Sequence, residues 1–247
     1  MRTIDLNCDV GEGCPTDAEM LGYATSANIA CGFHAGDVDT IARTVYAALN
    51  LGVAVGAHPG YRDRGRFGRV EMPLPSEDLQ TLITDQLETF TEIACRIGAK
   101  PTHVKPHGAL YNLSARDAST AEAIANAVFK FDPELILYGL AGSASITAAV
   151  DRGLRVAAEA FADRTYSNDG SLTPRSRPGA LITRADVAAR QAIAIAMDGV
   201  VESIDGSTLP ILADTICLHG DSPDAVGFAA AVRHGLEAHG IVARSLL

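Results

Sequence analysis

The feature that most constrains the fold is a repeating order of apolar run, Gly-rich polar loop and amphipathic segment. Short β-prone runs occupy residues 3–6, 27–30, 53–57, 103–105, 135–140, 155–160, 215–218 and 241–243. Between them, apolar residues recur at helical spacing over residues 38–49, 77–97, 120–130 and 183–197, and in a last segment that ends near residue 240. This alternation predicts parallel strands covered by helices.

Seven or eight such units follow one another with no linker, repeat or low-complexity stretch. The count predicts one α/β domain over residues 1–247 and favours an irregular (β/α) barrel with seven or eight parallel strands over an open doubly wound sheet. Hydrophobic residues make up 47% of the chain but aromatic residues only 5%, so the core is expected to consist of Ala, Val, Ile and Leu.

Charge and motif content exclude several classes of function. The formal net charge is -10 with no basic stripe, so nucleic acid is not an expected partner. No apolar run is long enough to span a membrane, and the first residues lack the pattern of a targeting segment, so we expect a cytoplasmic protein. The five cysteines are scattered and form no C-x-x-C pair, and no Gly-rich dinucleotide or P-loop motif is present.

Four of the seven histidines stand where an apolar run gives way to a loop. They are His34, His58, His107 and His219, in the segments NIACGFHAGD, VAVGAHPGY, HVKPHGALYN and TICLHGD. The carboxyl ends of parallel strands meet at one rim, so these imidazoles are predicted to share one site. The other three histidines, at positions 103, 234 and 239, lie away from this rim and are interpreted as structural or solvated.

Carboxylates and one lysine accompany the histidines at the predicted rim. Carboxylates beside imidazoles permit acid–base chemistry near neutral pH, and the same groups could bind a divalent metal through Asp9, His34, His58 and His219. The spacing does not decide between these alternatives. Lys105 lies in an apolar context, where its charge must be paired or its pKa lowered, so we interpret it as functional.

Two long polar loops, residues 60–75 and 163–179, are rich in arginine. Loops of this length are often functional, and arginine forks recognise carboxylate or phosphate, so both loops are interpreted as lids. The alternative is that these arginines are solvated surface charges.

Six motifs in order along the chain resemble the LamB/YcsF family, which is also known as the family of the 5-oxoprolinase A subunit. They are DLNCDVGEG, TSANIACGFHAGD, GAHPGY with FGR, HVKPHGALYN, FADRTYSNDGSLTPR and ICLHGD. The resemblance implies a deformed β/α barrel related to the polysaccharide deacetylases. It also implies that the chain acts with two further proteins, the B and C subunits, to open 5-oxoproline to L-glutamate, coupled to ATP hydrolysis.

An unstrained lactam is a stable amide, so its opening needs activation, a base, an acid for the ring nitrogen and cations for carboxylate and phosphate. The resemblance and the loop positions together suggest catalytic residues Asp9, Glu12, His34, His58, Lys105, His107, Glu159, Asp163 and His219. The suggested substrate-binding residues are Asn7, Asn28, Arg69, Tyr111, Asn112, Arg164, Arg175 and Asp221.

Two other functions stay open at this point. One is a stand-alone metal-dependent hydrolase of the deacetylase kind, and the other is a non-catalytic lactam-binding protein. The sequence leaves open which of the three proteins binds ATP and whether a divalent metal is required.

Overall fold

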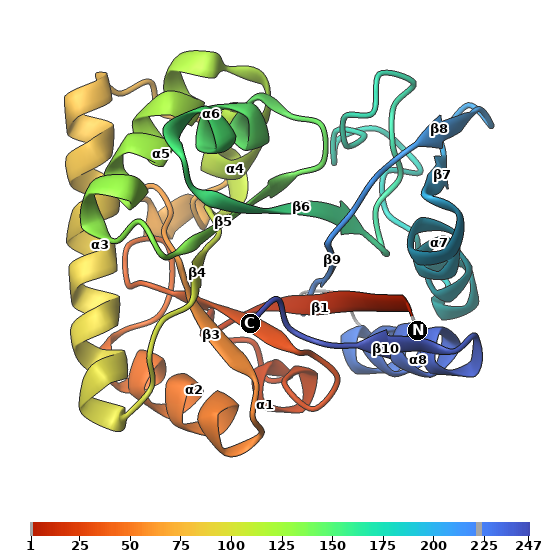
Figure 1. The fold of residues 1–247 in the computed structure, drawn as a ribbon, viewed down its shortest axis with the longest axis horizontal. Helices are drawn as coiled ribbons and strands as arrows, with labels where there is room; N and C mark the ends of the chain where they lie inside the picture. Colours follow the sequence, from red (N-terminus) through yellow and green to blue (C-terminus); the bar gives the residue numbers. More distant parts are fainter. Residues whose placement is uncertain (1, 221–223) are drawn as a thin grey trace.

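A closed parallel barrel forms the centre of the computed structural model, which describes residues 2–220 and 224–247. Within these residues an eight-stranded parallel sheet has the order β10-β1-β2-β3-β4-β5-β6-β9, and β9 also pairs with β1 (Figure 1). The strands are β1 (Arg2–Val10), β2 (Ser26–Ala30), β3 (Ala54–His58), β4 (His103–Val104), β5 (Ile136–Leu140), β6 (Arg155–Phe161), β9 (Thr215–Leu218) and β10 (Ile241–Ala243). Seven strands therefore close the barrel, and β10 is an eighth that lies outside the closure. The predicted irregular barrel is confirmed.

Strand β1 joins the two edges of the sheet because it is long enough to pair with three neighbours. Its first residues pair with β10, Asp5 to Cys8 pair with β9, and Asn7 to Val10 pair with β2. The apolar run at residues 3–6 indicated only the first part of this strand, since polar residues interrupt the apolar pattern from Asn7 onward.

Helices cover the outside of the barrel. They are α2 (Val38–Asn50), α3 (Ser76–Ile97), α5 (Ala118–Phe131), α6 (Ala144–Arg152), α7 (Ala185–Asp198) and α8 (Ala225–Ala238). Figure 1 shows α3 and α5 packed together on one side of the barrel, and α7 and α8 on the other. The apolar stripe of α3 is buried at Leu79, Ile83, Leu87 and Phe90, as its periodicity predicts. The hydrophobic core therefore lies between the strands and these helices. None of the described helices is long and apolar enough to cross a membrane.

Several short elements were not predicted. They are α1 (Asp17–Met20), the one-turn 3-10 helix η1 (Arg64–Arg66), α4 (Gly108–Arg116) and the antiparallel hairpin of β7 (Val200–Glu202) and β8 (Thr208–Pro210). Each is too short to show a clear hydrophobic period. The predicted helix at residues 183–197 begins two residues later, at Ala185.

The inside of the barrel is polar. Asp5, Asn7 and Asp9 alternate along β1 and face inward, whereas Leu6 and Cys8 join the apolar core outside. The Asp5 carboxylate is fully buried and accepts hydrogen bonds from the hydroxyl groups of Thr25, Ser26, Tyr138 and Thr215. These partners come from around the barrel, so a hydrogen-bonded network fills an interior that branched apolar side chains occupy in other barrels.

Candidate active site

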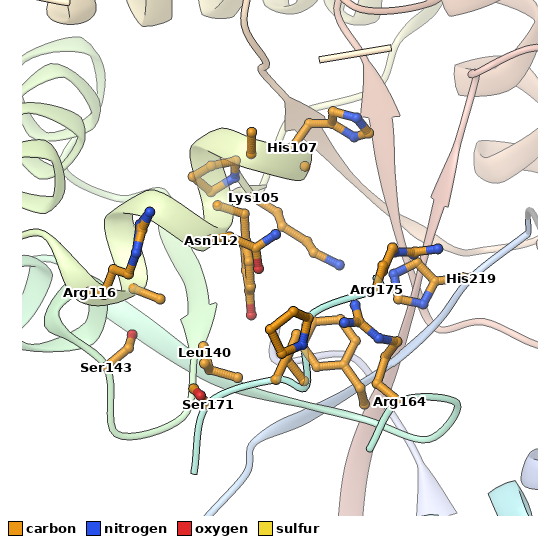
Figure 2. Close-up of a pocket in the computed structure, with 18 of the residues that line it drawn as sticks. Lys105, His107, Asn112, Arg116, Leu140, Ser143, Arg164, Ser171, Arg175 and His219 are labelled. Atoms are coloured by element: carbon orange, nitrogen blue, oxygen red, sulfur yellow. The ribbon is translucent and has the colours of Figure 1, made fainter. Parts of the chain in front are cut away.

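A pocket of about 750 Å³ opens at the carboxyl ends of the barrel strands. His58, Lys105, His107 and His219 line it from β3, β4 and β9 and the loops that follow, and Asp9 and Glu12 line it from the end of β1. Figure 2 shows Lys105 reaching toward Arg175 and His219 across the pocket. Parallel strand ends thus bring together residues that are far apart in the sequence, as predicted.

Lys105 is buried and its ammonium group is fully engaged. Its Nζ atom lies 2.8 Å from Glu159 Oε1, 3.0 Å from Asp9 Oδ1, 3.1 Å from Asn7 Oδ1 and 3.1 Å from Cys217 Sγ. Burial alone would lower the pKa of Lys105, but Asp9, Cys217 and Glu159 hold it well above its ordinary value. The side chain is therefore a permanent cation that contacts the carboxyl groups of both Asp9 and Glu159 inside the protein.

Buried amides hold Asp9 in position from below. Asn28 Nδ2 donates to Asp9 Oδ1 at 2.8 Å and to Asn7 Oδ1 at 2.7 Å, and His103 Nε2 donates to Asn28 Oδ1 at 2.9 Å. Burial, Lys105 and His58 lower the pKa of His103 to about 3, so this imidazole stays neutral. The structural interpretation of His103 is consistent with this contact.

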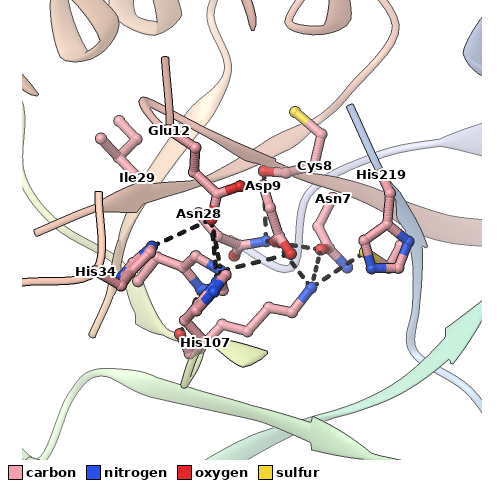
Figure 3. Close-up of polar contacts among 12 residues, drawn as sticks. Asn7, Cys8, Asp9, Glu12, Asn28, Ile29, His34, His107 and His219 are labelled. Atoms are coloured by element: carbon pink, nitrogen blue, oxygen red, sulfur yellow. Dashed lines mark hydrogen bonds and ion pairs between the residues drawn. The ribbon is translucent and has the colours of Figure 1, made fainter. Parts of the chain in front are cut away.

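A second cluster consists of Glu12, His34, His58 and His107 (Figure 3). Glu12 Oε1 lies 3.0 Å from His107 Nδ1, 3.2 Å from His34 Nε2 and 3.7 Å from His58 Nε2. His34 stacks on His107 with ring centroids 3.8 Å apart. Burial alone would raise the pKa of Glu12, but the surrounding imidazoles of His107, His34 and His58 lower it far below its ordinary value. Glu12 is therefore ionised among three imidazoles.

These four residues fit a divalent metal ion. Three imidazole nitrogens and one carboxylate oxygen are donors typical of zinc and related ions, and the four atoms lie within 4.8 Å of one another. His34 faces the cluster through Nε2, while its Nδ1 atom is buried beside Gly60. The sequence had suggested Asp9 and His219 together with His34 and His58, but the structure groups Glu12 and His107 with the latter two.

His219 forms a separate pair with Asp163. Its Nδ1 atom donates to Asp163 Oδ2 at 2.8 Å. Burial alone would lower the pKa of His219, but Asp163 and Asp9 raise it above its ordinary value, and Arg175 only partly opposes them. The pair therefore favours the protonated form of an imidazole that lines the pocket.

Arginines from both predicted lid loops line the pocket. Arg69 comes from residues 60–75, and Arg164 and Arg175 come from residues 163–179. Arg164 is buried, its guanidinium donates to Thr173 O at 2.7 Å, and its Nε atom has no hydrogen-bond partner. Burial and Arg175 lower the pKa of Arg164. An unpaired buried guanidinium N–H favours an anionic ligand at this point.

The remaining predicted residues fall into three groups. Tyr111 and Asn112 line the pocket, and burial raises the pKa of Tyr111 well above its ordinary value. Asn7, Asn28 and Glu159 are fully buried beneath the pocket and support Asp9 and Lys105. Asp221 lies outside the described residues.

Sequence reasoning missed two contributors to the site. Cys217 was counted only among the scattered cysteines, but its sulfur contacts the Lys105 ammonium group. Its position in the last apolar run, two residues before His219, was the available signal. Arg116, paired with Glu71 across the pocket, lies on the unpredicted helix α4.

Comparison with known proteins identifies the family. The model of the LamB/YcsF family matches residues 4–247. The chain belongs to the LamB/YcsF family. A relative from Bordetella parapertussis, named as the A subunit of 5-oxoprolinase, is 51% identical over 243 residues, which cover 96% of each chain.

Solved structures agree with this membership. The lactam utilization protein of Thermus thermophilus, 42% identical, superposes with a TM-score of 0.93 over 99% of this chain and 100% of that one. The peptidoglycan deacetylase PdaC of Bacillus subtilis is 14% identical and has a TM-score of 0.50 over 99% of this chain and 88% of that one. The second likeness concerns the fold alone: the barrel of this chain is similar in fold to that of a deacetylase.

Replacing Lys105 tests whether its ion pairs with Asp9 and Glu159 stabilise the folded protein. We expect Lys105→Met to lower the free energy of unfolding by about 3–5 kcal/mol, because Asp9 and Glu159 lose the buried charge that neutralises them. Adding Glu159→Gln should restore part of this loss. Urea unfolding of both variants measures it.

The exposed Lys130 offers a matched control, since Lys130→Met makes the same chemical change on the surface and should alter stability by less than about 0.5 kcal/mol. Equal stabilities of Lys105→Met and Lys130→Met would contradict a stabilising role of the buried Lys105 ion pairs.

Proposed function

We propose that the protein is the A subunit of an ATP-dependent 5-oxoprolinase, a cytoplasmic enzyme in which residues 1–247 act as one catalytic domain. It would hydrolyse 5-oxoproline to L-glutamate together with the B and C subunits. The observation that carries the proposal is one pocket that presents an imidazole with a raised pKa, ionised carboxylates and a buried guanidinium. The name of the Bordetella relative supports it.

The substrate has one carboxylate and one cyclic amide, and the pocket offers a partner for each. The buried N–H of Arg164, with Arg175 close by, suits the carboxylate. This orientation directs the lactam carbonyl toward Asp9 and the Glu12 cluster, which line the pocket from the β1 side.

Ring opening requires that water add to the carbonyl carbon, that the C–N bond break and that the ring nitrogen gain a proton. Asp9 is held ionised because His58 and Lys105 outweigh the effect of burial and keep its pKa well below the ordinary value. Its carboxylate can therefore accept a hydrogen bond from the attacking water and orient it. Asp163 and Asp9 raise the pKa of His219, which lines the same pocket, so we assign its imidazolium the proton that the leaving nitrogen takes up.

Glu12, His34, His58 and His107 would hold a divalent metal ion as a cofactor of the proposed enzyme. When bound, such an ion would polarise the lactam carbonyl and lower the pKa of water. Glu12 is already ionised and His34 is neutral, because burial lowers its pKa to about 4 despite its hydrogen bond to Glu12, so both are in the state that metal binding needs.

ATP is part of the proposed reaction because the lactam of 5-oxoproline is a stable amide that needs activation. Transfer of the γ-phosphoryl group of ATP to the amide oxygen would release ADP and convert the stable lactam into one that water can open. One water would cleave the C–N bond and leave an acyl phosphate, and a second water would release inorganic phosphate and L-glutamate. The pocket, at about 750 Å³, has room for a phosphoryl group beside the small ring, and Arg69 and Arg175 line it. The sequence contains no P-loop motif, which suggests that ATP binds with the help of the B and C subunits.

Reconstitution tests this function. Co-purified with the B and C subunits from the same source, the protein should release glutamate from 5-oxoproline only when ATP is present, and the chain alone should release little or none. An enzymatic glutamate assay measures both. A complete complex that leaves 5-oxoproline unchanged would overturn the proposal, and full ATP-coupled turnover by the isolated chain would overturn the need for partners.

The pH dependence tests the role of His219. Its raised pKa means that the imidazolium persists above pH 6.5, the ordinary value, and that both activity and the stability of the Asp163 pair are lost as pH rises through the raised pKa. Asp163→Asn removes the main group that raises it, so the alkaline limb of the rate profile should move to lower pH. The assembled enzyme is assayed across pH.

Asp205→Asn is the matched control, because Asp205 is a half-exposed carboxylate paired with Arg177. It should leave the limb in place. An unchanged limb in Asp163→Asn would exclude His219 as the proton donor.

A second function, that of a stand-alone metal-dependent hydrolase, is favoured by the Glu12 cluster. It would cleave amide or ester substrates after loading with a divalent ion, without ATP or partners. Turnover of acetylated substrates by the isolated metal-loaded chain, together with an inactive complex on 5-oxoproline, would favour it.

A further inference from the structure

Phe67 has an unusual backbone conformation beside the Glu12 cluster. Among the non-glycine residues that the structure describes, it is the one with a positive φ, at φ 57° and ψ 35°. The left-handed region is unfavourable for a side chain with a Cβ atom, most of all for bulky residues. Such strain persists only where the surroundings enforce it, and it is concentrated at functional sites.

The surroundings of Phe67 do enforce it. Gly68 N donates to Asp63 O at 2.9 Å, and Ala109 N donates to Gly68 O at 3.0 Å, which ties the loop to the start of α4. Arg64 donates to Gly32 O and to Gly36 O, at 2.8 and 2.7 Å, and so fastens the loop to the segment that carries His34. The loop that the sequence suggested as a lid is thus anchored against the cluster.

The consequence of this conformation is the position of the Phe67 carbonyl. Its oxygen lies 2.9 Å from His107 Nε2. A carbonyl can only accept, so in the neutral ring the proton must be on Nε2 and the lone pair on Nδ1. That lone pair faces Glu12 Oε1 and His58 Nε2, each 3.0 Å from His107 Nδ1.

The ring of His58 is likewise fixed by a backbone carbonyl, that of Lys105. Its Nδ1 atom lies 2.7 Å from Lys105 O, so Nδ1 carries a proton and the Nε2 atom is turned toward His107 Nδ1. Two ring nitrogens and a carboxylate oxygen then converge on one point, and a cation between them, either a proton or a metal ion, relieves their repulsion. Fixing a ring by a hydrogen bond to its other nitrogen is how proteins prepare metal-binding histidines.

We propose that Phe67 is a positioning residue whose left-handed backbone holds a carbonyl against His107 and so fixes the Nδ1 lone pair toward Glu12 and His58. The inference deepens the proposed function, because the cation that this lone pair would bind is the divalent ion suggested above. The phenyl ring is secondary to it, although the ring contacts His34 and His107 edge-on.

Two substitutions of similar size separate the backbone from the ring. Phe67→Asn and Phe67→Val both remove the phenyl group, but Asn tolerates the left-handed region and β-branched Val does not. The first readout is the ring ¹⁵N chemical shifts of metal-free protein labelled at histidine, at alkaline pH, with His107 assigned from His107→Gln. The second readout is the affinity for Zn²⁺ alone, measured by competition with a chelator.

We expect His107 to be the Nε2–H tautomer in the parent protein and in Phe67→Asn. Phe67→Val should shift the ratio of the two tautomers by about tenfold and weaken Zn²⁺ binding by roughly ten- to a hundredfold, against about threefold or less for Phe67→Asn. Phe67→Ala, which also disfavours the left-handed region, replaces Phe67→Val if the latter does not fold.

Two results would overturn the proposal: a proton on Nδ1 of His107 in the parent protein, or equal tautomer ratios in Phe67→Asn and Phe67→Val. A parent protein that shows the Nε2–H tautomer, with the expected difference between the variants, supports the positioning role even if Zn²⁺ does not bind. In that event only the metal in the proposed function fails.

Discussion

One buried ammonium group determines how the rest of the site is built. Lys105 lies at the top of the barrel interior with Asp9, Glu159, Asn7 and Cys217 within 3.1 Å of its Nζ atom. A charge in such a place is tolerated only if it is paired and hydrogen-bonded on all sides. Asp9 is therefore ionised and fixed before any substrate arrives. The buried amide of Asn28 donates a further hydrogen bond to the Asp9 carboxylate, and the amide oxygen of Asn7 accepts one from Lys105.

The outer face of the barrel strands contributes mainly to stability, and the inner face contributes mainly to the arrangement of the active site. Outside, apolar side chains pack the strands against the helices, as for Ile83 and Phe90 of α3. Inside, hydrogen bonds run from Asp5 through Thr215 and Asn7 to Glu159 and Lys105. The polar interior adds little net stability, because each hydrogen bond replaces one to water, but it makes the orientation of Asp9 at the pocket unique.

The sequence predicted the barrel and the rim because both follow from local patterns. Apolar runs followed by Gly-rich loops mark strand ends, so His58, His107 and His219 could be brought together without coordinates. The sequence could not predict features that depend on the register of the strands and on the backbone dihedral angles of the loops. Whether Asn28 faces the pocket or supports Asp9, and whether His107 or His219 joins Glu12, depends on strand neighbours and depth. The left-handed Phe67 has no signal in the sequence, since glycine or asparagine is expected there.

In the proposed function, one pocket at the carboxyl ends of the strands binds and opens the lactam. A crystal structure of the protein with 5-oxoproline is the sharpest test of this role. We predict the substrate carboxylate against Arg164 and Arg175, the lactam carbonyl on the side of Asp9 and the Glu12 cluster, and the ring nitrogen facing His219. Ordered 5-oxoproline bound elsewhere, with this pocket unoccupied at saturating concentration, would contradict it.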